Sequence, residues 1–288
     1  SVIEAQPTLG SQTSFANGGQ LSYRYVAPLA DAGVPWQAMG WMLRGDSPLK
    51  LRPRMDPAQW RWLASFMAAC RGSVNQRNGA HLLRLALLSQ ATMQQWREDD
   101  HLDGFAWQRN GKLVAFRGQA NFDKARQKVI HSSFQQPLSA SECARLEPGL
   151  QGSAFVGGIY TPSEEVGDCH AFCQQLTTRL QASGRCTFLL GKTVTRIHHA
   201  NGAVQAVEMG NDVLAVDQLV LAAGHNSPAL RLPGLNLALY PLKGYSLTLA
   251  LSDPQKAPQV SITDYDRKIV YARIGEQLRI AAMVDIVG

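Results

Sequence analysis

The chain has 288 residues, of which 45% are hydrophobic and 17% are charged, and its formal net charge is +6. This length suits one large domain or two smaller ones, and the composition excludes a disordered or collagen-like chain. No apolar run approaches the roughly 20 residues that a membrane-spanning helix requires, so we predict that the chain does not cross a membrane by itself.

The first residues predict a nucleotide-binding unit only weakly. Val2–Glu4 is typical of the end of a buried strand, and in a dinucleotide-binding unit the acid at this point bonds the ribose hydroxyls. The glycine-rich turn G-x-G-x-x-G that precedes such a strand is not in the sequence. The loop over residues 10–22 carries T-S-F-A-N-G-G, whose small residues suit close approach to a phosphate or a flat ring. A plain surface turn has the same composition.

Two helices are predicted next. Asp56 is a good N-cap, Pro57 suits the first helical position, and the helix extends to Arg71. A second helix is predicted over residues 80–98. Its predicted buried side chains are Leu82, Leu85, Leu88 and Met93. Arginines and tryptophans interleave through residues 36–62, and we favour packing over nucleic-acid binding because half of these tryptophans lie on the first helix.

The following block combines a hairpin with two helices. Residues 105–116 predict a β-hairpin, because Asn-Gly at its centre is the strongest short hairpin signal. A polar helix is predicted over residues 121–133. Ser139 and Glu142 have the spacing of a capping box, which opens a short helix that ends before Pro148.

A further helix is predicted to begin at Asp168 and to end at Gly184, where the chain returns from one domain to another. Cys169 and Cys173 share one face of this helix. Because no second Cys or His pair has matching spacing, we favour core packing over a metal site. The five cysteines are odd in number and scattered, which favours a reducing compartment over a disulfide framework.

Strands occupy most of the remaining chain. A β-meander is predicted over residues 193–216, with its first turn at Asn201-Gly202. The near-continuous apolar run over 219–223 predicts a parallel strand buried on both faces. It ends at Ala223 and Gly224, where a ligand crevice is expected. Antiparallel strands are predicted over 239–251, 268–272 and 277–284, and we expect them to pair with the earlier hairpin.

Five segments match one family in their order and spacing, and they span essentially the whole chain. They are Thr13–Ser22, Pro28–Leu43, Glu164–Phe172, Tyr240–Thr248 and Leu278–Gly288. On these segments the chain resembles the small subunits of bacterial D-amino acid dehydrogenases. That family lies within the D-amino acid oxidase, glycine oxidase and sarcosine oxidase group of flavoenzymes. The motifs E-E-V-G-D-C and Y-P-L-K-G-Y-S-L-T are specific.

The resemblance implies an α/β plus α+β fold in two interleaved parts. An incomplete, Rossmann-like FAD-binding domain would comprise residues 1–35 and 158–233. An antiparallel-sheet substrate domain would comprise residues 36–157 and 234–288. The family's first strand with its glycine-rich turn and its C-terminal segment have no counterpart here, so we expect an internal fragment that binds FAD poorly by itself.

The activity that the resemblance implies is FAD-dependent oxidative deamination of D-amino acids to 2-oxo acids and ammonia. It also implies that electrons pass to a quinone or another respiratory acceptor. The expected location is cytoplasmic, with peripheral association at the inner face of the bacterial inner membrane, and no nucleic-acid partner is expected.

The resemblance also implies site residues. Lys243 and Tyr245 would contact the substrate, whose carboxylate needs a cation or hydroxyl donors. We identify neither a catalytic acid or base nor a metal site. The implied cofactor contacts are Glu4, Ser14, Asn17, Gly18, Gly19, Val194, Ala223 and Gly224.

Three alternatives stay open. The first is a related dehydrogenase or oxidase that acts on hydroxyproline, sarcosine or glycine, which only the cavity residues would decide. The second is a non-catalytic fragment or subunit, which would lack a bound yellow chromophore. The third, a basic binder of nucleic acid or of a membrane surface, is least favoured because the basic residues are dispersed along the sequence.

Overall fold

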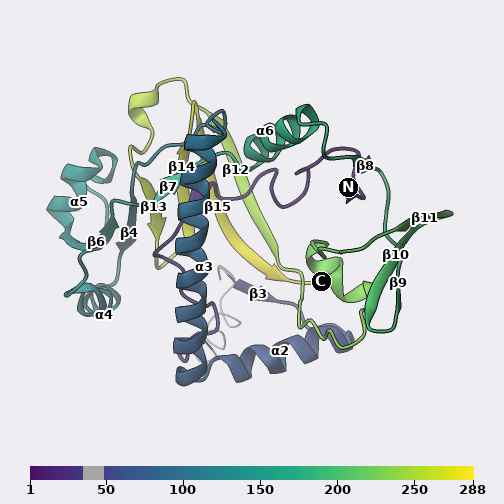
Figure 1. Ribbon diagram of the computed structural model, residues 1–288. Helices are drawn as coiled ribbons and strands as arrows, with labels where there is room; N and C mark the ends of the chain where they lie inside the picture. Colours follow the sequence, from purple (N-terminus) through teal and green to yellow (C-terminus); the bar gives the residue numbers. More distant parts are fainter. Residues whose placement is uncertain (35–48) are drawn as a thin grey trace.

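The computed structural model describes residues 1–34 and 49–288, and its largest feature is an eight-stranded mixed sheet (Figure 1). The strands are β3 (Leu49–Leu51), β4 (Lys112–Phe116), β5 (Gln136–Ser139), β6 (Gly157–Thr161), β12 (Lys243–Ala250), β13 (Ser261–Asp264), β14 (Ile269–Ile274) and β15 (Gln277–Ile286). Seven of them follow the order β12-β15-β14-β13-β4-β6-β5, and β3 pairs with β15. The pairs β13–β4 and β3–β15 are parallel, and the other pairs are antiparallel. The sheet therefore brings both halves of the chain together.

β4 lies at the centre of the hydrophobic core, because all five of its side chains are buried. Leu113 and Ala115 belong to one buried cluster, and Val114 and Phe116 belong to another. Since strand side chains alternate between the two faces of a sheet, this strand has a core on each side.

The predicted hairpin over 105–116 is wrong. Its second half forms β4, but β4 pairs with β13 and β6, and Gln108 makes an isolated bridge to Val166. The amide of Gly111, in the predicted turn, donates to the Glu164 carbonyl (3.0 Å). A strand buried on both faces needs a neighbour at each edge, and here the neighbours come from distant parts of the chain.

Two helices follow the undescribed segment, α2 (Pro57–Ala69) and α3 (Gly72–Asp99). The Asp56 carboxylate accepts from the Ala58 amide (2.9 Å), which confirms the predicted N-cap. α3 begins eight residues before its predicted start at residue 80. In Figure 1, α2 runs along one end of the molecule and α3 rises from it across the sheet.

The predicted burial of the leucines on α3 is wrong. Leu82, Leu85 and Leu88 are exposed, and no residue of α3 is fully buried. The helix instead turns small and polar residues towards the molecule. Asn75 donates to the Ala30 carbonyl (2.6 Å), and Gln90 donates to the Ser163 carbonyl (3.4 Å). The spacing of the leucines identified an apolar stripe, but it did not indicate which side of the helix the rest of the molecule would cover.

Short sheets and helices complete the molecule. Strand pairs join β1 (Val2–Glu4) to β8 (Phe188–Leu190) in parallel and β2 (Gln20–Leu21) to β7 (Glu165–Val166) in antiparallel. The predicted meander is confirmed as β9 (Arg196–Ala200), β10 (Ala203–Met209) and β11 (Asp212–Ala215). The remaining elements are α4 (Gln119–Val129), α5 (Ala140–Leu146), η1 (Pro148–Leu150), α6 (Cys169–Ala182), η2 (Gly224–Leu230) and η3 (Pro254–Lys256).

The sequence signals for the start of a helix are confirmed at α5 and α6. The capping box of Ser139 and Glu142 is present at α5. The Asp168 carboxylate accepts from the Ala171 amide (2.9 Å) at the start of α6, as predicted. The five cysteines are all free.

The predicted buried strand over 219–223 is wrong. The segment is irregular, it leads into η2, and the Val220 side chain is 89% exposed. A parallel strand buried on both faces requires hydrogen-bonded neighbours, and no strand of the described chain pairs with this segment. Its apolar composition therefore does not produce a strand here.

Some sequence predictions fall on residues 35–48, which lie outside the described residues. They include Trp36, Trp41 and Arg44, and most of the matching segment over 28–43. Within residues 1–34 and 49–288, no helix combines the length and the apolar character needed to cross a membrane.

Candidate functional site

The glycine-bearing loop that precedes β2 packs directly on one face of the large sheet. The Ser246 hydroxyl on β12 donates to the Ala16 carbonyl (2.7 Å). A Cβ atom at Gly18 would lie 3.6 Å from Val270 on β14 and 3.7 Å from Ala281 on β15. Three neighbouring strands therefore support this loop, and the predicted cofactor residues of the loop have a rigid base.

The conformation of the loop requires glycine at one position. The Asn17 side-chain carbonyl accepts from the Gly19 amide (3.0 Å), which closes a tight turn. Gly19 has φ +66°, and a Cβ atom there would overlap Ile274 of β14. The Gly19 carbonyl accepts from the Gly167 amide (3.0 Å), so the turn is also fixed to the start of α6. Because the loop backbone lies this close to the sheet, the surface that it offers to a ligand is small and is lined by backbone amides.

Arg279 on β15 is a site residue that the sequence reasoning missed. Its side chain is only 7% exposed, and one terminal nitrogen (Nη1) donates to the Asn17 carbonyl (2.7 Å). Its Nε is buried and has no hydrogen-bond partner. Within the described residues no carboxylate forms an ion pair with Arg279. The structure thus places an uncompensated positive charge beside the loop, which suits an anionic or carbonyl-bearing ligand. A charged residue between Leu278 and Ile280 in an apolar strand was the available signal.

Glu4 and Val194 occupy one strand-and-loop unit. Glu4 ends β1, its carboxylate accepts from the Gln6 amide (2.8 Å), and its carbonyl accepts from the Lys192 amide (3.0 Å). Val194 follows Lys192 by two residues and is half-buried. The structure therefore brings these two predicted cofactor contacts into the same region.

The structure places the other predicted cofactor residues in different surroundings. Ser14 is half-buried in the loop and hydrogen-bonds to the Cys173 thiol, whose pKa is raised mainly by burial. Ala223 and Gly224 are exposed at the start of η2. In the described chain no hydrogen bond links either of them to the loop.

The two predicted substrate residues lie together on the edge strand β12. The Lys243 ammonium is 5.7 Å from the centre of the Tyr245 ring, and the Tyr245 hydroxyl donates to Asp285 (2.9 Å). This hydrogen bond is the main reason that the pKa of Tyr245 is raised, and burial adds to it. Because Ser246 faces the loop and strand residues alternate, Tyr245 projects from the opposite face. The structure does not bring these two residues together with Asn17–Gly19.

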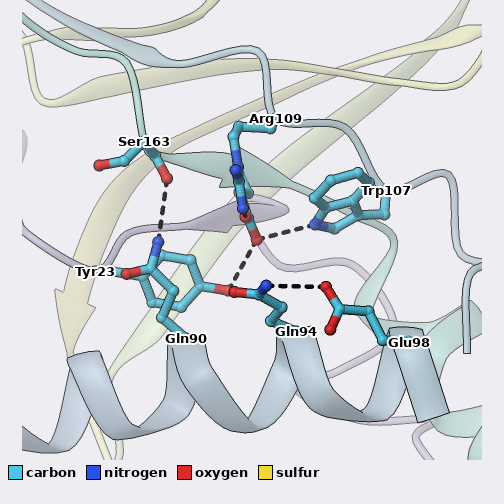
Figure 2. Close-up of polar contacts among 8 residues, drawn as sticks. Tyr23, Gln90, Gln94, Glu98, Trp107, Arg109 and Ser163 are labelled. Atoms are coloured by element: carbon cyan, nitrogen blue, oxygen red, sulfur yellow. Dashed lines mark hydrogen bonds and ion pairs between the residues drawn. The ribbon is translucent and has the colours of Figure 1, made fainter. Parts of the chain in front are cut away.

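A buried carboxylate, Glu165 on β7, fixes the chain that follows the loop. It is 4% exposed, and it accepts from the Tyr23 hydroxyl (3.1 Å), the Trp107 indole (2.9 Å) and the Arg109 guanidinium (3.2 Å). Figure 2 shows these three donors converging above α3, beside the contact of Gln90 with Ser163. Burial is the largest cause, and Glu165 the next, of a pKa for Tyr23 above its ordinary range.

The neighbouring carboxylate, Glu164, holds the backbone of the same segment. It accepts from the amides of Tyr23 (2.8 Å) and Arg24 (2.7 Å). Burial raises the pKa of Glu164, and these amides oppose that effect. Lys112 is also buried, donates to the Ser22 hydroxyl (2.8 Å), and has its pKa lowered by burial to about 8. The matching motif E-E-V-G-D thus serves mainly as an anchor for the loop's C-terminal end.

The donor set fits a nucleotide cofactor rather than a metal. Across the described ranges, no group of three or more His, Cys, Asp and Glu side chains could hold a metal ion. The loop instead offers glycine backbone and the buried, unpaired Nε of Arg279. These features suit the phosphates or the flat ring of a dinucleotide.

Comparison with known proteins gives consistent results. The model of the family described as FAD dependent oxidoreductase (DAO) matches residues 1–287. The chain is 66% identical over 287 residues to D-amino acid dehydrogenase 2 of Pseudomonas aeruginosa, covering 100% of this chain and 69% of that protein. It is 43% identical to D-amino acid dehydrogenase 2 of Ralstonia nicotianae, covering 100% of this chain and 70% of that protein.

Solved structures resemble it in fold. Glycine oxidase from Geobacillus kaustophilus superposes with a TM-score of 0.67 at 17% identity, over 98% of this chain and 64% of that chain. Iminodiacetate oxidase from Chelativorans sp. BNC1 superposes with a TM-score of 0.61 at 15% identity, over 99% of this chain and 71% of that chain. The chain thus spans about two thirds of the length of these proteins.

Proposed function

The chain belongs to the DAO family of FAD-dependent oxidoreductases, and we propose that it catalyses the FAD-dependent oxidative deamination of D-amino acids. The observation that carries this proposal is 66% identity, over the whole chain, to a protein named D-amino acid dehydrogenase 2. The products are a 2-oxo acid and ammonia, because the imino acid formed first is hydrolysed by water.

The cofactor site in this proposal is built around the glycine-bearing loop. Glu4 would bind the adenosine ribose, and the Val194 backbone would lie at the adenine. Ser14 and Asn17–Gly19 would lie along the pyrophosphate and the flavin, next to Arg279. The packing of the loop against β12, β14 and β15 supports this arrangement. Ala223 and Gly224 complete the proposed contacts.

The two-part organisation is also part of the proposal. Residues 1–35 and 158–233 would form the FAD-binding part, and residues 36–157 and 234–288 the substrate part. The parallel pair of β1 and β8 supports the first assignment, and the large sheet supports the second.

In the proposed reaction, the protein orients the substrate and the cofactor and supplies charged groups that bind them. The chemistry that FAD supplies when bound is acceptance of a hydride from the substrate Cα. The loop and Arg279 hold their ligand in one position, which is the main requirement for such a transfer. Lys243 and Tyr245 offer an exposed cation and a phenol at an open sheet edge, so they are the proposed contacts for the substrate carboxylate as the substrate approaches around this edge.

A visible absorption spectrum of the purified protein tests the activity. We expect flavin bands near about 450 nm that bleach when D-alanine or D-proline is added without oxygen. L-alanine and L-proline are the matched controls. Bleaching by glycine, sarcosine or hydroxyproline in the same assay would identify one of the related amine oxidoreductases instead. Because the chain is expected to bind FAD poorly by itself, the spectrum is recorded with excess FAD, and flavin bands that no D-amino acid bleaches would contradict the proposal.

We also propose that the electrons leave through a quinone or another respiratory acceptor. The support is that the two relatives compared above are named dehydrogenases. With D-alanine as substrate, a short-chain quinone should be reduced faster than oxygen is consumed. Equal or faster oxygen consumption would identify an oxidase instead.

A further inference from the structure

A cavity of about 460 Å³ lies on the face of the large sheet opposite the glycine-bearing loop. Ile262 on β13 and Tyr271 on β14 are paired across the two strands, and both line the cavity. Val270, the neighbour of Tyr271, instead lies beside Gly18 of the loop. Because strand side chains alternate between the two faces, the sheet separates the cavity from the loop. In Figure 1, β13 and β4 also lie on the opposite side of the molecule from β1 and β8.

The size and the walls of the cavity suit a small molecule. Sites for small molecules usually occupy roughly 300–1,000 Å³ and have mostly apolar walls with a few placed polar groups. The apolar walls here come from η1, β13, β14 and the segments beside them, and they include Pro148, Leu150, Phe155, Pro258, Ile262 and Tyr271. A ligand in this cavity therefore carries an apolar or aromatic part.

One polar group of the cavity is a buried carboxylate, Glu147, whose side chain is 3% exposed. It accepts from the amides of Gly149 (3.3 Å), Gln259 and Val260 (3.2 Å). An ionised carboxylate has about four acceptor positions, so these three amides leave one position open. Among the described side chains, none forms an ion pair with Glu147. A buried negative charge without a cation favours a ligand that supplies one.

The second polar group is the guanidinium of Arg117, which also lines the cavity. Its Nε donates to Asp264 (2.8 Å), and its Cζ lies 4.3 Å from the centre of the Phe155 ring. These two contacts hold the guanidinium in a fixed orientation. Arginine has five N–H donors, and a single carboxylate such as that of Asp264 takes two of them when it binds in a bidentate manner. The remaining terminal N–H groups suit a carboxylate of the ligand.

We infer that this cavity binds a free α-amino acid with an apolar or aromatic side chain. The ammonium group pairs with Glu147, the carboxylate pairs with Arg117, and the side chain packs against Phe155 and Tyr271. This inference goes beyond the proposed function, because an amino acid bound here lies across the sheet from the cofactor loop. It is bound at this place and is not oxidised there.

The two charged groups favour a free amino acid over the end of a peptide. The amino terminus of a peptide has an ammonium group but no adjacent carboxylate, and its carboxyl terminus has the reverse. Each end would leave one charged side chain of the cavity without its partner, which is costly where water is excluded. A zwitterion supplies both partners and leaves the net charge of the cavity unchanged.

Isothermal titration calorimetry of the protein in excess FAD tests the inference. L-Phenylalanine is the probe, because the proposed activity acts on D-isomers, and it should bind saturably with one molecule per chain. Phenethylamine lacks the carboxylate and 3-phenylpropionate lacks the ammonium group. Each should bind at least about ten-fold more weakly, since a hydrogen bond to a charged group contributes about this factor. The flavin absorption spectrum should not change when L-phenylalanine is added.

Two positions that line the cavity provide variants. Ser153 is exposed at the cavity, so Ser153→Trp should fill it and abolish binding, while Ser153→Ala is the matched control and should bind like the parent. Arg117→Lys keeps a positive charge beside Asp264 but removes the planar donors. It should weaken binding of L-phenylalanine by about ten-fold and leave that of phenethylamine unchanged. Circular dichroism and thermal unfolding confirm that each variant is folded.

Three outcomes would overturn the inference. They are equal affinity for L-phenylalanine and either analogue, unchanged binding in Ser153→Trp, or a shift of the flavin spectrum that places the probe at the cofactor. Bleaching of the flavin by D-alanine is measured separately on every variant. A protein that binds L-phenylalanine in this cavity but is not bleached contradicts the proposed activity alone, and one that is bleached without such binding contradicts only the cavity.

Discussion

Single buried residues hold the segments around the loop together. Glu165 receives donors from Tyr23, Trp107 and Arg109, which lie far apart in sequence from β7. Buried charge is stable only when its hydrogen-bonding capacity is filled, and here three donors from two different segments fill it. A change at Glu165 therefore acts on both segments at once.

We expect Glu165→Gln to lower the free energy of unfolding by about 3 kcal/mol, because the amide removes the charge and replaces one acceptor with a donor. Urea denaturation followed by circular dichroism measures this. Glu276→Gln changes an exposed glutamate and is the control. A Glu165→Gln variant as stable as that control would show that the carboxylate is not an anchor.

Lys112 makes stability depend on pH. Burial lowers its pKa from 10.5 to about 8, and Glu164 opposes this effect. Between these two values the unfolded chain binds more protons than the folded chain, so the folded state gains stability as the pH rises. The penalty of burying the charged ammonium is fully present below pH 8.

The comparison of Lys112→Met with the parent isolates this effect. Between pH 7 and pH 11 the parent should gain on the order of 3 kcal/mol in unfolding free energy relative to the variant. Denaturation curves at several pH values provide the measurement. Lys128→Met, at an exposed position on α4, should show no such trend, and an equally flat Lys112→Met difference would contradict the prediction.

At the scale of elements, local signals were reliable and long-range pairing was not. Asp168 and Ser139 cap their helices as predicted, because a cap depends on only a few neighbouring residues. Asn201-Gly202 likewise forms the predicted turn between β9 and β10 of the meander. The hairpin at 105–116 and the strand at 219–223 failed, because strand formation depends on partners that are distant in sequence.

The candidate site shows the same difference between local signals and long-range contacts. The composition of the loop indicated a ligand contact, and the structure added the sheet face on which it rests. Arg279 and Ser246 reach the loop from strands more than 200 residues away, so no pattern within the loop itself indicates that they contact it. The face on which Tyr245 lies likewise depends on the register of β12 with β15.

Two adjacent glycines test the role of the loop's support. Gly19→Ala should lower both FAD affinity, by at least about ten-fold, and stability, because its φ of +66° and the contact with Ile274 exclude a Cβ atom. Gly18→Ala is the matched control for the effect on stability, since a Cβ atom there meets only ordinary contacts at 3.6 Å or more. Fluorescence titration of FAD and thermal unfolding measure the two effects. Equal losses in both variants would argue against a specific turn at Gly19.

At the scale of the whole molecule, the family resemblance established the fold class and the chemistry, while the topology determined how the parts are joined. One sheet takes strands from residues 49 to 286, and the loop before β2 rests on its C-terminal strands. The hydrophobic pattern specifies which residues prefer burial, but several partners can satisfy that preference equally well. The exposed leucines of α3 are the clearest instance.

The central position of β4 has a consequence for deuterium uptake. Its amides lie between β13 and β6 beneath a core on each face, so they exchange only when the whole sheet opens. β12, an edge strand whose eight residues are all exposed, should exchange far earlier. Mass spectrometry of peptides after timed labelling would rank the two strands. Uptake in β4 therefore reports global opening, and uptake in β12 reports local fluctuation of the sheet edge that carries Lys243 and Tyr245.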